Sequence, residues 1–116
     1  MKRLILEKLE KWKQSKRRKP LLLRGARQVG KTWVLKEFGN TFADGFVHID
    51  FDKQVEYRQF FEQTKDVKRI LDNLALATGK KITPKTLIIF DEIQACESAL
   101  NSLKYLSKSA LIVSVS

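Results

Sequence analysis

Several residue types are scarce in this chain of 116 residues, and each scarcity excludes a class of protein. A single cysteine, Cys96, allows no internal disulfide, which argues against a disulfide-stapled secreted domain and favours a reducing cytoplasm. A single histidine, His48, has no carboxylate or cysteine at metal-ligand spacing, so we expect it to be structural. No apolar run approaches the ~20 residues that span a bilayer, and the amino terminus becomes charged too early for a signal peptide. We therefore expect no membrane partner.

Basic residues are plentiful, and their excess lies near the start of the chain. The net charge is +10, and residues 1–36 carry 13 of the 23 Lys and Arg residues but only two acids. A basic cluster precedes the first predicted strand: Lys16, Arg17, Arg18 and Lys19. Such a cluster can bind nucleic acid by releasing counterions. It can equally be the solvated end of an amphipathic helix, because Trp12 is the only aromatic residue near it.

Residues 25–32 match the phosphate-loop pattern G-x-x-x-x-G-K-[ST] at every defined position. Main-chain N–H groups in such a loop, and the first turn of the helix that follows, hydrogen-bond the phosphates of a nucleotide. Lys31 is expected to reach the β- and γ-phosphates, and Thr32 to offer its hydroxyl to a Mg²⁺ that bridges them. The residues expected to bind the nucleotide are Gly25, Ala26, Arg27, Gln28, Val29, Gly30, Lys31 and Thr32.

A second motif lies further along the chain, where four apolar residues (87–90) precede Asp91 and Glu92 in the form of a Walker B strand. The carboxyl end of that strand should lie beside the phosphate loop, so Asp91 is expected to reach the Mg²⁺ through its water shell. Glu92 would then orient and partly deprotonate an attacking water. The two adjacent acids therefore favour hydrolysis of ATP over phosphoryl transfer to a small molecule.

The hydrophobic periodicity predicts an α/β fold in which strands alternate with helices around a parallel sheet. We expect an amino-terminal amphipathic helix and linker over residues 1–19, and a nucleotide-binding domain over residues 20–116. Leu76 and Ala77 are expected on the apolar side of a helix at 67–78, and Leu100 on the buried stripe of a helix at 97–107. Strands are predicted at 20–24, 46–51, 87–90 and 110–115, and further helices at 2–15, 32–38 and 55–63.

Taken together, residues 19–32 and 87–95 resemble a family of prokaryotic AAA-type predicted ATPases whose full-length members add a carboxy-terminal, nuclease-like domain. Two dipeptides make the resemblance more specific than the general Walker patterns: Arg27-Gln28 inside the loop and Ile93-Gln94 after the acid pair. It implies a three-layer phosphate-loop core with strand order 1-4-3-2 and a fifth strand outside the first. It also implies ATP and Mg²⁺ as ligands and Glu92 as the catalytic base, with Lys31 required for binding.

The sequence also departs from this family. The fifth strand, the helical lid, the arginine finger and the carboxy-terminal domain are not found, and only Ser114 or Ser116 could replace the polar sensor that follows the fourth strand. We therefore expect a fragment that hydrolyses ATP slowly and that can self-associate through its exposed first strand. The alternatives are a nucleic-acid-binding module that uses the basic cluster, and a remnant without a stable fold.

Overall fold

The computed structural model describes residues 2–15, 19–23 and 31–115, and within them four parallel strands form one sheet. The strands are β1 (Leu21–Leu23), β2 (Phe46–Asp50), β3 (Leu87–Asp91) and β4 (Leu111–Val115). Their order is β1-β4-β3-β2, which confirms the predicted order. β3 and β4 are buried along their whole length, as the apolar runs of central parallel strands require.

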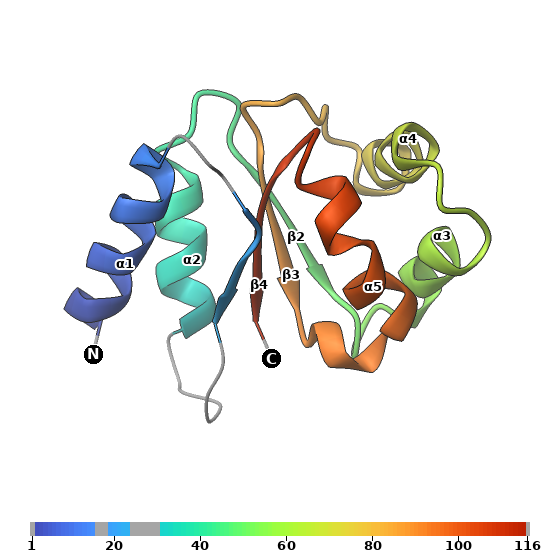
Figure 1. The fold of residues 1–116 in the computed structure, drawn as a ribbon, viewed down its shortest axis with the longest axis horizontal. Coiled ribbons are helices and arrows are strands. Elements are labelled where there is room, and N and C mark those ends of the chain that lie inside the picture. The colour runs from blue at the N-terminus through green and yellow to red at the C-terminus, as the bar shows by residue number, and fades with distance from the viewer. Residues whose placement is uncertain (1, 16–18, 24–30, 116) are drawn as a thin grey trace.

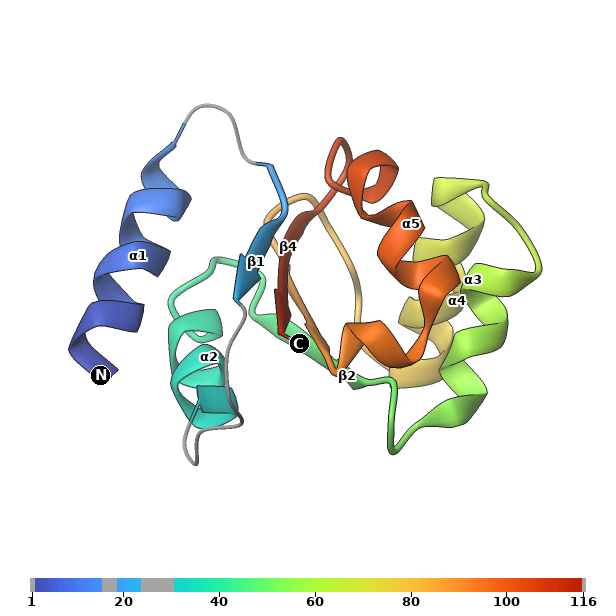
Figure 2. The same ribbon diagram turned by 60° about the horizontal axis from the view of Figure 1, so that its bottom comes forward.

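Helices cover both faces of the sheet, so the fold has three layers (Figures 1 and 2). Helices α1 (Lys2–Gln14) and α2 (Lys31–Gly39) lie on one face. The other face carries the remaining elements: η1 (Val55–Arg58), α3 (Gln59–Glu62), α4 (Val67–Thr78), η2 (Ile93–Ala95) and α5 (Glu97–Leu106). The predicted α/β fold is confirmed.

Two apolar cores result from this arrangement, one on each face of the sheet. Alternate residues of β3 divide between them: Ile89 packs toward α1 and α2, whereas Phe90 packs toward α3–α5. On the second face, the rings of Phe51, Phe61 and Phe90 contact one another with centroids 5.3–5.6 Å apart. These contacts fix the carboxyl end of β3, where the predicted acid pair lies.

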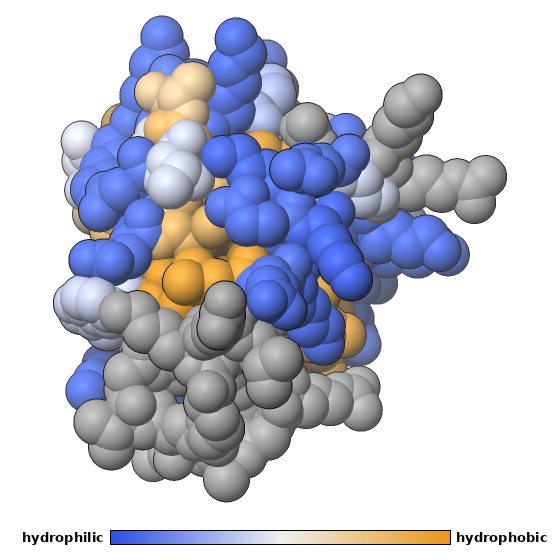
Figure 3. All heavy atoms as spheres, turned by 90° about the vertical axis from the view of Figure 1, so that its left-hand side faces the viewer, coloured by the Kyte–Doolittle hydropathy of each residue, from blue (hydrophilic) through white to orange (hydrophobic). Residues whose placement is uncertain are grey.

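The amino-terminal helix belongs to the first core. Leu9 and Trp12 of α1 are buried in the same cluster as Leu35 and Phe38 of α2, and the Trp12 indole donates to the carbonyl of Lys19 at 2.6 Å. Figure 3 views this side of the molecule, where most of the coloured side chains are hydrophilic and an apolar patch lies between them. α1 therefore packs against the same core as α2 and the sheet, and the predicted boundary at residue 19 stays a prediction.

A close approach joins the end of α2 to the first residue of β2. A Cβ atom on Gly39 would lie 2.5 Å from Cβ of Phe46, a distance that side chains do not tolerate. Glycine at this position lets the end of α2 lie directly against β2. This contact sets the position of the helix whose first residue is Lys31.

Three details of the predicted elements are wrong. Residues 55–63 form the 3₁₀ turn η1 and the short α3 rather than one helix. Leu76 is 82 % exposed and Ala77 is exposed as well, because both lie on the solvent side of α4. Leu100 is 41 % exposed, since α5 buries Leu103 and Leu106 instead. Among the described residues, no helix is long and apolar enough to cross a membrane.

Candidate functional site

The candidate site lies at the edge of the sheet where the parallel strands end and where α2 begins (Figure 1). Lys31 and Thr32 are the first two residues of α2, which contacts β2 and β3. Helix N-termini carry partial positive charge and unpaired N–H groups, so this edge favours an anion. The predicted loop residues 25–30 lie outside the described residues.

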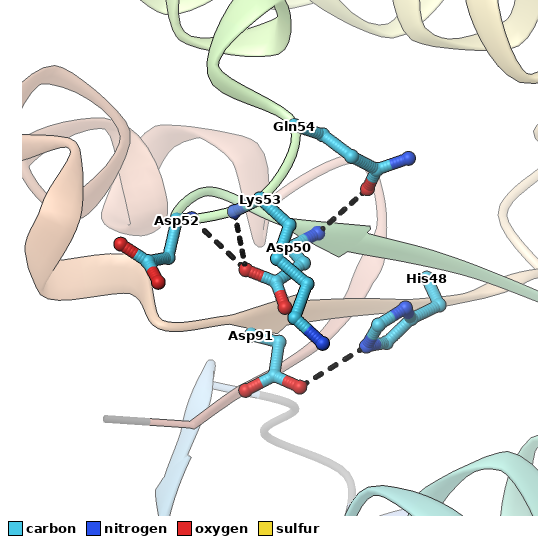
Figure 4. Close-up of polar contacts among 6 residues, drawn as sticks. All are labelled: His48, Asp50, Asp52, Lys53, Gln54 and Asp91. Atoms are coloured by element: carbon cyan, nitrogen blue, oxygen red, sulfur yellow. Dashed lines mark hydrogen bonds and ion pairs between the residues drawn. The ribbon is translucent and has the colours of Figure 1, made fainter.

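Asp91 is the last residue of β3 and points to the face of the sheet that carries α2. Its neighbour Phe90 faces the opposite core, and alternation along the strand places Asp91 on the α2 side with Ile89. The side chain is only 12 % exposed, and its Oδ2 accepts a hydrogen bond at 3.2 Å from Nε2 of His48. A nearly buried carboxylate is thus held at the site edge by a side chain from the neighbouring strand (Figure 4).

Glu92 is the only residue other than glycine with a positive φ among the residues that the structure describes. Its φ of 53° and ψ of 45° are left-handed, a conformation that costs a residue with a Cβ atom about 1–2 kcal/mol. The buried side chains of Phe90 and Ile93 on either side hold the backbone in place. One carboxylate oxygen of Glu92 accepts a hydrogen bond from the Gln94 amide at 2.6 Å.

The loop that follows β2 borders the candidate site, and hydrogen bonds hold its backbone in place. The Asp50 carboxylate accepts hydrogen bonds from the N–H groups of Asp52 and Lys53 at 2.9 and 3.1 Å, and the Gln54 amide oxygen accepts from the Asp50 N–H at 2.9 Å. The N–H of Phe51 donates to the Asp91 carbonyl at 3.0 Å. These bonds, shown in part in Figure 4, fix the backbone next to Asp91.

His48 makes a contact that the sequence analysis did not identify. We expected it to be structural, and its Nε2 lies 3.2 Å from Oδ2 of Asp91. In the register of β2 and β3, Asp50 pairs with Asp91 and His48 pairs with Ile89, so His48 and Asp91 are diagonal neighbours on one face. The resemblance already implied that these two strands are adjacent, but the contact depends on their register, which the sequence did not supply.

Ser114 does not lie on the same face as Asp91, so it does not suit the predicted sensor role. It pairs with Phe90 in the register of β3 and β4, and paired residues of parallel strands share a face. Its hydroxyl is buried and has no hydrogen-bond partner among the described residues. Ser116, the alternative, lies outside the described residues.

Cys96 fills space rather than taking part in the site. It is 3 % exposed within the core of α3–α5, and burial raises the pKa of its thiol. A raised pKa keeps the sulfur protonated and unreactive near neutral pH. The interpretation of Cys96 as a small core residue agrees with this environment.

The side chains at this edge of the sheet suit a Mg²⁺ ion that binds phosphate oxygens as well as the protein. Among the described residues, no three His, Cys, Asp or Glu side chains cluster in a way that could hold a metal alone. Magnesium usually binds one or two carboxylates together with substrate phosphates and water. Asp91, with one oxygen held by His48, is a donor of this kind.

The fold and the site edge define the class: an α/β protein with an all-parallel sheet in the order 1-4-3-2, as in phosphate-loop NTPase cores. A family model described as an AAA domain matches residues 17–115, and the chain therefore belongs to this AAA domain family. Comparison with curated proteins and with solved structures gave no match. Family membership supports nucleotide binding in general terms.

Proposed function

We propose that the chain binds ATP together with Mg²⁺ at the carboxyl edge of the sheet, and that the site is built for hydrolysis of the γ-phosphate. The observation that carries this proposal is the placement of Asp91 and Glu92 at the end of β3, on an edge that α2 enters with its N-terminus at Lys31. Carboxylates for a metal and a positive helix end for phosphate thus meet at one place.

Each residue has a distinct role in this proposal. The loop of residues 25–30 and the start of α2 bind the phosphates through main-chain N–H groups, and Lys31 neutralises their charge. Thr32 and Asp91 hold the Mg²⁺, which supplies charge neutralisation at the β- and γ-phosphates when it is bound. Glu92 orients the attacking water and accepts its proton.

The backbone strain at Glu92 supports its assignment as the base. Strained residues persist where the surrounding structure determines them, and they cluster at functional sites. Glu92 lies between the buried residues Phe90 and Ile93, so its carboxylate leaves the strand at a fixed position beside Asp91. The hydrogen bond from Gln94 limits the rotation of that carboxylate further.

Binding and turnover can be tested with two substitutions and one fluorescent ATP analogue. Lys31→Ala should remove Mg²⁺-dependent binding of the analogue, whereas Glu92→Gln should bind it like the parent and release no phosphate from ATP. Removal of Mg²⁺ by a chelator should weaken binding in the parent. If Glu92→Gln hydrolyses ATP at the parental rate, Glu92 is not the base.

A separate candidate function is nucleic-acid binding through Lys16, Arg17, Arg18 and Lys19, which the excess of basic residues near the chain start favours. Of these four residues, the structure describes Lys19, which is exposed. DNA retention that falls steeply with salt, survives Lys31→Ala and disappears when the four residues are neutralised would favour this function over nucleotide binding.

A further inference from the structure

We infer that His48 is a positioning residue for the magnesium-linked carboxylate Asp91, an inference that rests on the proposed function. The two side chains come from adjacent strands and lie on the same face of the sheet, which α2 covers. Nε2 of His48 lies 3.2 Å from Oδ2 of Asp91. Figure 4 shows the imidazole and the carboxylate directed toward one another across β2 and β3.

The chemistry of the two side chains determines which of them donates the hydrogen bond. An ionised carboxylate only accepts hydrogen bonds, so the proton of this contact is on Nε2 of the imidazole. The bond holds Oδ2 of Asp91 and restricts rotation of the carboxylate that is proposed to serve the metal or its water shell. Hydrogen bonds to metal-ligating carboxylates orient them in this way, and their loss typically weakens metal affinity 10–100-fold.

The strand and the buried residues around His48 hold its side chain in a fixed position. It occupies the middle of β2, between the buried residues Val47 and Ile49, and its own side chain is only 20 % exposed. The next residue on its face, Asp50, is held by the loop hydrogen bonds described above. His48 therefore approaches Asp91 from a fixed strand rather than from a mobile loop.

The first test measures how much Mg²⁺ is needed for ATP to stabilise the protein against heat. His48→Leu removes the donor, His48→Asn keeps an amide that is too short to reach Asp91, and His48→Gln places an amide N–H near the position of Nε2. We expect His48→Leu and His48→Asn to need about tenfold more Mg²⁺ for half of the stabilisation, and His48→Gln to stay close to the parent. Equal Mg²⁺ requirements in His48→Leu and the parent would overturn the inference.

Asp52→Asn is the matched control, because Asp52 is an exposed carboxylate in the adjacent loop. It should leave the Mg²⁺ requirement unchanged. The design separates the two proposals. If ATP fails to stabilise the parent at any Mg²⁺ concentration, the proposed function fails and the role of His48 fails with it. If ATP stabilises the parent and His48→Leu alike, only the role of His48 fails.

A second test does not depend on the folding of a His48 variant. His48 is the single histidine of the chain, so the ¹⁵N and ¹H signals of its imidazole can be assigned without ambiguity. We expect a proton on Nε2, and a shift of these signals in Asp91→Asn but not in Asp52→Asn. Identical imidazole signals in the parent and in Asp91→Asn would show that the contact is absent in solution and would overturn the inference.

Discussion

At the scale of single residues, Glu92 combines a proposed chemical role with a backbone conformation that favours glycine. Its left-handed φ and ψ cost about 1–2 kcal/mol relative to glycine, and the burial of Phe90 and Ile93 on either side offsets that cost. Selection for stability alone would favour glycine here. A carboxylate in a backbone conformation that favours glycine supports the proposed chemical role of Glu92.

Glu92→Gly should therefore raise the free energy of unfolding by about 1 kcal/mol while it abolishes hydrolysis. Gly79 provides the matched control, because it ends α4 with a similar left-handed φ of 69°. Gly79→Ala should lower the free energy of unfolding by about 1 kcal/mol. Urea denaturation of the three proteins measures both changes. A loss of stability in Glu92→Gly as large as that in Gly79→Ala would contradict the strain argument.

At the scale of elements, α4 shows how an amphipathic helix is started and oriented. The Asp66 side chain caps it by accepting a hydrogen bond from the Lys68 N–H at 3.1 Å, and Gly79 ends it. Leu74 is fully buried in the core, whereas Leu76 faces solvent. The helix lies on the face of the sheet opposite to Asp91, so changes in it should affect stability and leave nucleotide binding intact.

Two substitutions in α4 test this orientation. Leu74→Ala should lower the free energy of unfolding by about 2–5 kcal/mol, because it leaves a cavity in the core. Leu76→Ala should change it by less than about 0.5 kcal/mol, since the side chain is exposed. Thermal or urea denaturation measures both. Equal losses in the two variants would mean that the face of α4 is assigned wrongly.

The cap can be tested in the same way. Asp66→Ala should cost about 1 kcal/mol, because one N–H group in the first turn of α4 loses its acceptor. Asp66→Asn keeps an acceptor oxygen and should retain most of the stability. If Asp66→Ala unfolds at the same urea concentration as the parent, the cap does not contribute.

The elements also show what could be predicted from the sequence. Apolar runs and helical periodicity were enough to predict the strands and α4 over residues 67–78. The strand order was predicted only from the family resemblance. Residues 55–63 were harder, because a 3₁₀ turn and a short helix share the periodicity of one helix over so few residues. The partner of His48 required the register of β2 against β3, which is a tertiary property.

At the scale of the whole molecule, the outer side of β1 is an edge of the sheet in the described structure. β1 pairs with β4 and has no strand on its other side among the described residues. A groove of about 690 Å³ lies between β1 and α5, with exposed Leu22 and Leu100 in its lining and Lys19, Lys104 and Lys108 among its charged residues. An apolar edge of this kind favours self-association, which the lysines oppose by repulsion.

We therefore expect the 116-residue chain to self-associate with rising concentration, and more strongly at high salt, where the repulsion is screened. Leu22→Lys should shift the equilibrium toward the monomer. Leu76→Lys should not, because Leu76 is an exposed leucine outside the groove. Sedimentation velocity across a range of concentrations measures the effect, and identical behaviour of the two variants would rule out association through β1.

The central claim is that this AAA domain binds Mg²⁺ and ATP through the loop that leads into α2. The most direct test is a thermal melt followed by circular dichroism, with and without Mg²⁺ and ATP, in the parent and in Lys31→Ala. A ligand at 100 times its Kd should stabilise the parent by about 2.7 kcal/mol, which raises the Tm by on the order of 10 °C. The account predicts this shift in the parent and its loss in Lys31→Ala. A cooperative melt of the parent that is indifferent to Mg²⁺ and ATP would contradict it.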